Sequence, residues 1–207
     1  MKSLPEIFVS TDIETDGWVP GQNSILSIGS AAFFCDKTFI DAFSVNLKTL
    51  PESSPNPESM AWWQTQPKAW QACRENCQEP QNAMREYHKW LCQLPGQIIF
   101  VAEPLVFDFM FVDYYLQRFA GNNPFGFASI DIRSYIMGMK NLDFSDSKLN
   151  ALPKKWFDNL PHTHIAIDDA IEQGTLFCNL LLKQQQMKLS SRPTKFSQTT
   201  LNKNAIK

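Results

Sequence analysis

The order of the apolar segments along the chain constrains its fold more than any other feature. Three strand-like runs come first, at residues 7–11, 24–35 and 38–47, and the last two are close enough to form a hairpin. Residues 97–102 then have the pattern of a buried strand, and residues 107–119 place apolar side chains at helical spacing. A strand followed directly by a helix is typical of α/β domains, so we expect an α/β fold.

The remaining segments continue this alternation. Residues 68–94 have helical periodicity that is interrupted near Pro80, which predicts two short helices. A weak strand is expected at residues 127–130, and helical material follows as far as Lys140. The strongest helix is expected at about residues 165–185. The sequence shows no internal repeat, so the pattern indicates one domain.

Length and charge divide the chain into a folded part and a tail. With 207 residues, of which 43% are hydrophobic, the chain is long enough for one well-packed domain, which we place at residues 1–182. Residues 183–207 carry six basic side chains and no acidic one, which leaves 13 basic and 21 acidic side chains in the rest. We expect this basic tail to be flexible. The alternative is that it holds a polyanion by releasing counterions.

The cysteines and the apolar segments indicate the compartment. None of the five cysteines has the spacing of a paired zinc knuckle, so free thiols in a reducing, cytoplasmic environment are expected. The N-terminus has no basic stretch followed by an apolar run, and the most apolar window, residues 98–116, contains Glu103, Asp108 and Asp113. We therefore expect neither export nor membrane insertion.

Two carboxylic acids, Asp12 and Glu14, follow the first predicted strand directly. Side chains two positions apart in an extended chain point to the same side, so both carboxylates can face one site. Oxygen ligands of this kind suit Mg²⁺ or Mn²⁺ better than zinc, and a pair of such ions can clamp the attacking and leaving oxygens of a phosphodiester. A turn with a helix cap is the structural alternative for this triplet.

Two further clusters contain acids that need a partner. Asp108 stands among phenylalanines where a strand gives way to a helix, and a carboxylate there is costly to bury alone. A first-turn acid that caps the helix is the alternative for this residue. His164 precedes Asp169 by five positions at the start of the last helix, so a loop imidazole and a helix carboxylate can reach one site, as a general base and a metal ligand must.

The three clusters together resemble the exonuclease motifs of the DEDD superfamily, which contains ribonuclease T, oligoribonuclease and the proofreading subunit of bacterial DNA polymerase III. Asp12-Ile13-Glu14-Thr15 resembles the first motif, Phe107-Asp108 the second, and residues 164–170 the third, His-x-Ala-x-x-Asp-Ala. The resemblance spans about residues 5 to 180. It implies a ribonuclease H-like exonuclease fold, with a mixed five-stranded sheet and helices on both faces.

The third motif also indicates the subgroup. The sister class has tyrosine four residues before the last aspartate, where this chain has Ile165, so the histidine subgroup is indicated. His162 and Asp168 lack the family spacing, and we expect no catalytic role for them. One departure is Pro104, which stands where relatives often have asparagine. We expect this change to alter how the terminal nucleotide is held more than whether metal binds.

The resemblance implies a two-metal 3′-to-5′ exonuclease that releases nucleoside 5′-monophosphates. Two ions, Mg²⁺ or Mn²⁺, would be held by Asp12, Glu14, Asp108 and Asp169, while His164 takes a proton from the attacking water. The expected partners are the 3′ ends of single-stranded RNA or DNA, because a terminal base can enter the site only when it is unpaired. Aromatic rings are the usual seat of such a base, and the residues expected to bind it are Thr15, Gly17, Trp18, Trp63 and Phe109.

Several alternatives stay open at this point. Core packing is the alternative for each aromatic ring, including Trp62. A module of the same fold could bind nucleic-acid ends or a polymerase without cutting, and a ribonuclease H-like endonuclease could use the same acids but would give His164 no clear task. The sequence does not separate RNA from DNA, nor a monomer from the homodimer that is frequent among relatives.

Overall fold

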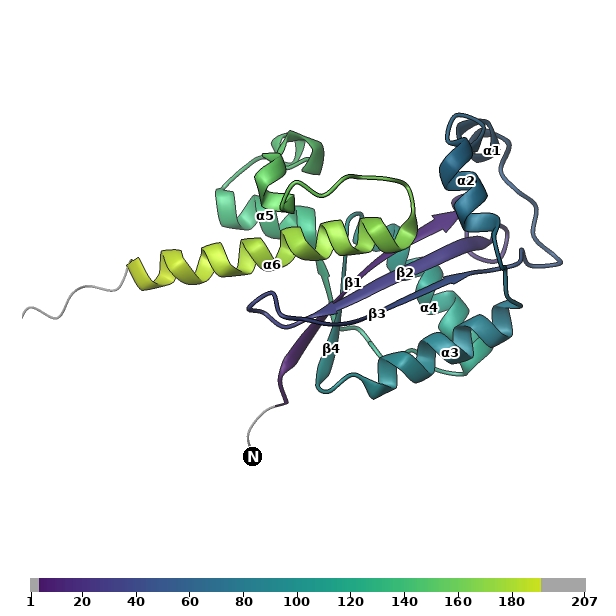
Figure 1. The fold of residues 1–207 in the computed structure, drawn as a ribbon, viewed down its shortest axis with the longest axis horizontal. Coiled ribbons are helices and arrows are strands. Elements are labelled where there is room, and N and C mark those ends of the chain that lie inside the picture. Colours follow the sequence, from purple (N-terminus) through teal and green to yellow (C-terminus); the bar gives the residue numbers. More distant parts are fainter. Residues whose placement is uncertain (1–3, 191–207) are drawn as a thin grey trace, which may run out of the picture.

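The computed structural model describes residues 4–190, and its centre is a mixed five-stranded sheet (Figure 1). The strand order is β3-β2-β1-β4-β5. Strand β1 pairs antiparallel with β2, which pairs antiparallel with β3, whereas β4 is parallel to both β1 and β5. The strand bounds are β1 Glu6–Thr15, β2 Ile25–Phe33, β3 Phe39–Asn46, β4 Gln97–Ala102 and β5 Ser129–Asp131.

Helices cover both faces of this sheet. Alternation along β1 sends Ile7 and Val9 to one face, where they pack with α3 (Pro80–Gln93) and α4 (Leu105–Ala120). Phe8 points to the other face and packs with Phe177 of the long helix α6, Ala166–Ser190. Figure 1 shows α6 lying across one side of the sheet, with α3 and α4 on the opposite side. The predicted five-stranded α/β architecture with helices on both faces is confirmed.

Shorter helices surround this core. Helices α1 (Pro57–Trp63) and α2 (Pro67–Arg74) stand beyond the end of β1 (Figure 1). Helix α5 (Ile132–Lys140) follows β5, and three 3₁₀ turns lead from it to α6, at Phe144–Asp146, Leu149–Ala151 and Lys154–Phe157. None of the helices in residues 4–190 is long and apolar enough to cross a bilayer.

A glycine on β2 brings the start of α6 close to β1. Gly29 pairs with Asp12 across the β1–β2 ladder. A Cβ atom at Gly29 would lie 2.2 Å from the backbone carbonyl carbon of Ala166, the first residue of α6. Only a residue without a side chain permits this approach, because real Cβ atoms never come so near to backbone. The contact places the first turn of α6 directly beside Asp12.

Two boundaries differ from the predicted ones. Strand β1 continues to Thr15, so Asp12 and Glu14 lie within the strand, because β2 supplies partners as far as Ile25. Helix α6 continues to Ser190, so residues 183–190, which were expected to belong to the tail, are helical. Lys, Gln, Met and Leu dominate this segment and favour helix even where little packs against it. The rest of the predicted tail, 191–207, lies outside the described residues.

Candidate active site

Four carboxylates meet at the carboxyl end of β1. One oxygen from each of Asp12, Glu14 and Asp169 lies within 4.8 Å of the other two. Asp108 joins them from the first turn of α4, where its Oδ1 accepts a hydrogen bond of 3.3 Å from the backbone N–H of Ile13. Asp12 and Glu14 share one side of β1 because they are two residues apart, as the sequence predicts. The structure therefore brings all three sequence clusters to one place.

Burial is the main cause that raises the pKa values of Asp12, Glu14 and Asp108. Burial raises the pKa of Asp12 well above its usual range, and the charges of Asp108, Glu14 and Asp169 raise it further. Burial, followed by Asp169 and Asp108, raises the pKa of Glu14 to about 9. Burial likewise raises the pKa of Asp108, which is 3% exposed. The cluster thus holds protons when it has no cation, because several buried anions side by side are unfavourable.

The donor set fits hard divalent cations. All four side chains offer oxygen alone, and three of them are at most 8% exposed. Mg²⁺ and Mn²⁺ bind such ligands, and their charge would offset the repulsion that raises these pKa values. Asp12, Glu14, Asp108 and Asp169 are therefore the side chains suited to hold them. This agrees with the ligand set expected from the motifs.

His164 lies in the loop just before α6, beside this cluster. Its backbone N–H and that of Thr163 donate hydrogen bonds of 2.9 and 2.8 Å to the two carboxylate oxygens of Asp169. The backbone of His164 has φ of 57°, a left-handed conformation that a non-glycine residue keeps only when its surroundings require it. Burial and the neighbouring His162 lower the pKa of His164 although Asp169 opposes this, so the imidazole favours its neutral, proton-accepting form.

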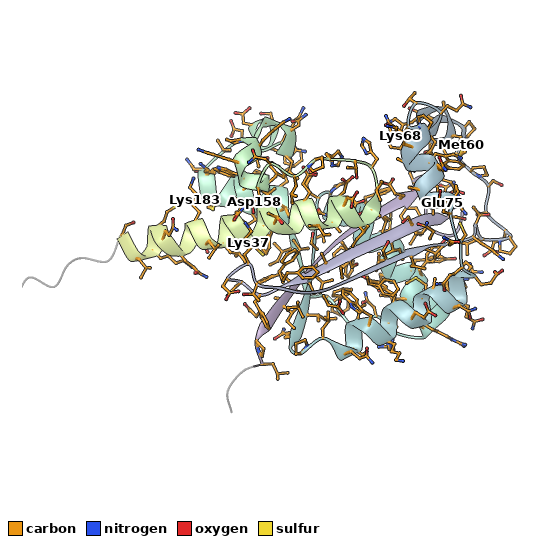
Figure 2. The ribbon with its side chains drawn as sticks, viewed as in Figure 1. Lys37, Met60, Lys68, Glu75, Asp158 and Lys183 are labelled. Carbon is orange, nitrogen blue, oxygen red and sulfur yellow. The ribbon has the colours of Figure 1, made fainter. Side chains whose placement is uncertain are left out.

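The loop that carries His164 is tied to the rest of the fold. Lys37, in the β2–β3 hairpin, forms an ion pair with Asp158 near the end of the 3₁₀ segment (Figure 2). Asn179 of α6 accepts a hydrogen bond of 3.1 Å from Lys37 and donates one of 3.0 Å to Asp158. The segment that precedes residues 162–164 is thus anchored to both α6 and the hairpin.

A cavity of about 300 Å³ lies on the Glu14 side of the cluster and contains aromatic rings. Thr15 and Trp18, two of the residues expected to bind the terminal base, line it, and Trp18 is 51% exposed. Trp62 of α1 also lines the cavity, is 40% exposed and meets the His164 ring edge-on at 5.1 Å between centroids. Phe107 lines the same wall. The cavity can therefore seat a flat ring beside the carboxylates.

The other three predicted substrate residues differ in their surroundings. Trp63 lines the same cavity, but it is 2% exposed and its indole N–H donates a 2.9 Å hydrogen bond to the Thr15 carbonyl, so it forms part of the wall rather than offering a ring face. Phe109 packs edge-on against Phe100 in the core and lines neither cavity described here. A Cβ at Gly17 would lie 2.2 Å from the Asn23 side chain, so this glycine permits a close approach, and it lines neither of these two cavities.

A second cavity, of about 800 Å³, begins on the other side of the cluster at Asp12 and Asp169. Three cationic side chains line it, Arg133, Lys148 and Lys154. Arg133 is held in place by hydrogen bonds to the Ser147 hydroxyl and the Phe144 carbonyl, and its guanidinium stacks on the Phe144 ring. The two cavities thus flank the carboxylates, one with rings and one with positive charge.

Sequence reasoning missed two side chains at the site. His162, for which no role was expected, places Nδ1 3.3 Å from an Asp169 oxygen and 2.9 Å from an oxygen of Glu172. Glu172 follows Asp169 by three residues, and that spacing on a helix puts both acids on one face. The three-residue spacing from Asp169 could have identified Glu172 as a neighbour of the site from the sequence. Pro104 stands at the N-cap of α4, where no side-chain cap hydrogen bond forms.

Comparison with known proteins agrees with this geometry. Residues 8–181 match the family described as 3′-5′ exoribonuclease Rv2179c-like domain. The chain is 30% identical over 180 residues to the 3′-5′ DNA exonuclease Cap18 of Escherichia coli, covering 86% of this chain and 92% of that protein.

Solved structures share the fold at low identity. The nuclease domain of 3′hExo, a DEDDh family member bound to rAMP, has a TM-score of 0.62 at 12% identity, over 88% of this chain and 93% of that one. E. coli exonuclease I bound to a dT13 oligonucleotide has a TM-score of 0.66 at 15% identity, over 89% of this chain and 42% of that one. The chain belongs to the Rv2179c-like family and is a 3′–5′ exonuclease.

Proposed function

We propose that the enzyme uses divalent metal ions to hydrolyse the terminal phosphodiester of single-stranded DNA or RNA and releases nucleoside 5′-monophosphates. The observation that carries this proposal is the pair of cavities on either side of the carboxylates. A strand laid across them seats its 3′-terminal base among Trp18, Trp62 and Phe107, and its upstream phosphates meet Lys148 and Lys154. A paired terminal base would have to leave its partner to enter the ring-lined cavity.

The side chains divide the reaction between them. Asp12, Glu14, Asp108 and Asp169 would hold two ions, which supply positive charge beside the phosphate oxygens and make water easier to deprotonate. Neutral His164 accepts the proton of the attacking water. Attack at phosphorus breaks the bond to the 3′ oxygen of the preceding nucleotide, which leaves the phosphate on the released one. Asp169 keeps its orientation through the N–H groups of Thr163 and His164.

The proposal is tested with matched single-stranded DNA and RNA oligonucleotides labelled at the 5′ end, each with a free or a phosphate-blocked 3′ end. We expect a ladder that shortens from the free 3′ end, mononucleotide product, slower loss of duplex, and no reaction in EDTA. Internal fragments that appear first would instead indicate an endonuclease. Binding without any cleavage, under conditions that saturate metal, would indicate a non-catalytic end-binding module.

Trp62→Ala is expected to weaken substrate binding more than it slows the chemical step. Stacking of a base on an aromatic ring is worth about 1–3 kcal/mol, so KM for a single strand should rise by roughly 5- to 150-fold. Trp62→Phe keeps a ring at this position and should recover most of the loss. Steady-state kinetics on a short oligonucleotide separate KM from kcat, and an unchanged KM in the alanine variant would remove Trp62 from the binding site.

A further inference from the structure

A second group of potential metal ligands lies immediately beside the carboxylate cluster. His162, His164 and Asp169 each offer one ligand atom, and these three atoms lie within 4.8 Å of one another. The two imidazole rings meet at 4.6 Å between centroids. Glu172 completes the group, with one oxygen 2.9 Å from His162 Nδ1. The proposed exonuclease reaction uses His164 and Asp169 and assigns nothing to His162 or Glu172.

The donors of this group differ in kind from those of the carboxylate cluster. Two imidazole nitrogens with carboxylate oxygens suit zinc and similar transition ions, whereas oxygen alone suits Mg²⁺ and Mn²⁺. Zinc–ligand bonds of about 2.0–2.1 Å place neighbouring donors of a tetrahedral site about 3.3 Å apart. His162 Nδ1 lies 3.3 Å from Asp169, which matches this spacing, and 2.9 Å from Glu172, which is somewhat shorter. The arrangement needs little movement to close around an ion.

Much of the group is held in position before any ion binds. Asp169 is 4% exposed, and the N–H groups of Thr163 and His164 fix both of its oxygens. Glu172 is on the same face of α6, and its side chain is 13% exposed. The His162 side chain is 58% exposed, so the site opens to solvent on that side. An ion can therefore enter without unfolding the loop.

We propose that His162, His164, Asp169 and Glu172 form an inhibitory site for a zinc-class divalent ion, which differs in its donor set from the carboxylate cluster and shares Asp169 with it. Binding there occupies the imidazole lone pair of His164 and an oxygen of Asp169. The inhibitory consequence rests on the proposed function, because it is the proton-accepting nitrogen of His164 that the ion withdraws. Binding itself does not depend on that function.

Zinc binding is measured by calorimetry on the full chain in millimolar Mg²⁺, which occupies oxygen-only ligands, without nucleic acid. We expect one zinc ion to bind the native protein and the affinity to fall at least about tenfold in His162→Ala, since even outer ligands of a metal change affinity by 10–100-fold. His88→Ala is the matched control. His88 lies on α3, where its Nδ1 is 3.8 Å from the Cys92 Sγ, and its replacement should leave this binding event unchanged.

The zinc affinities of the native protein and the two variants show whether the ion binds at His162. Equal zinc affinity in the native protein and His162→Ala would show that His162 only forms an ion pair with Asp169 and Glu172, and would overturn the site. A loss of affinity in His88→Ala would place the zinc at His88 and Cys92 instead. If the native enzyme degrades oligonucleotides in Mg²⁺ but zinc neither binds nor inhibits, the inference alone fails. If zinc binds through His162 but no oligonucleotide is cleaved, the proposed function fails and the site stands.

Discussion

His164→Ala is expected to lower kcat on a single-stranded oligonucleotide by about 10²- to 10⁴-fold, the usual contribution of a positioned general base. The variant keeps all four carboxylates, so its metal affinity should stay close to that of the native enzyme. His88→Ala removes a partly exposed imidazole from α3 and should retain native kcat. A His164→Ala enzyme with native turnover would show that the proton of the attacking water goes elsewhere.

The pH dependence of kcat for the same reaction is expected to reflect the protonation of His164. Burial lowers the pKa of His164 below its ordinary value of 6.5, so the proton-accepting form persists at lower pH. The acidic limb of the kcat profile should therefore fall below pH 6.5 and disappear in His164→Ala. A limb centred above 6.5 would indicate a different titrating group.

The metal-free protein is expected to lose stability as pH rises, and divalent metal should remove that loss. The pKa of Glu14 is about 9 in the folded protein against an ordinary value of 4.5, so the folded state binds more protons than the unfolded chain between these values. The free energy of unfolding therefore falls with rising pH in this window. Mg²⁺ or Mn²⁺ replaces the protons, so its stabilising effect should grow from about pH 5 to pH 9.

Unfolding temperatures measured across this pH range, with EDTA or with millimolar metal, check the effect. Two curves that run parallel would contradict it. Asp16 offers an internal comparison, because burial also raises its pKa but it does not belong to the metal-ligand group. Asp16→Asn should therefore leave the metal-induced difference in place.

The strands, the long helices and the three acidic clusters could be predicted because each depends on short-range patterns. Alternation in β1 puts Asp12 and Glu14 on one side, and a five-residue spacing relates His164 to Asp169 across a loop and the first turn of α6. Their convergence follows from the parallel β1–β4 pair and from Gly29, which lets α6 approach.

Which aromatic side chains line the cavities could not be predicted, because this depends on the face of its helix on which each one lies. Trp62 and Trp63 are adjacent on α1, so a helix turns them about 100° apart and only one can face the core; the structure buries Trp63. The sequence is ambiguous in the same way for Phe107, which lines a cavity, and Phe109, which packs on Phe100. Lys148, Lys154 and His162 belong to the segment of 3₁₀ turns and loop between α5 and α6, which has no regular periodicity. Their position at the site could therefore not be predicted from a sequence pattern.

Titration of the native protein and Asp12→Asn with Mn²⁺ at about pH 8, followed by unfolding temperature, tests most directly whether these acids gather around metal. Asparagine resembles the protonated form of Asp12, which burial already favours, so the variant should fold. Metal at about 100 times its Kd stabilises by about 2.7 kcal/mol, which for a chain of this size raises Tm by roughly 5–10 °C. We expect this rise in the native protein and little in Asp12→Asn; equal rises in both, or none in the native protein, would contradict metal binding by these acids.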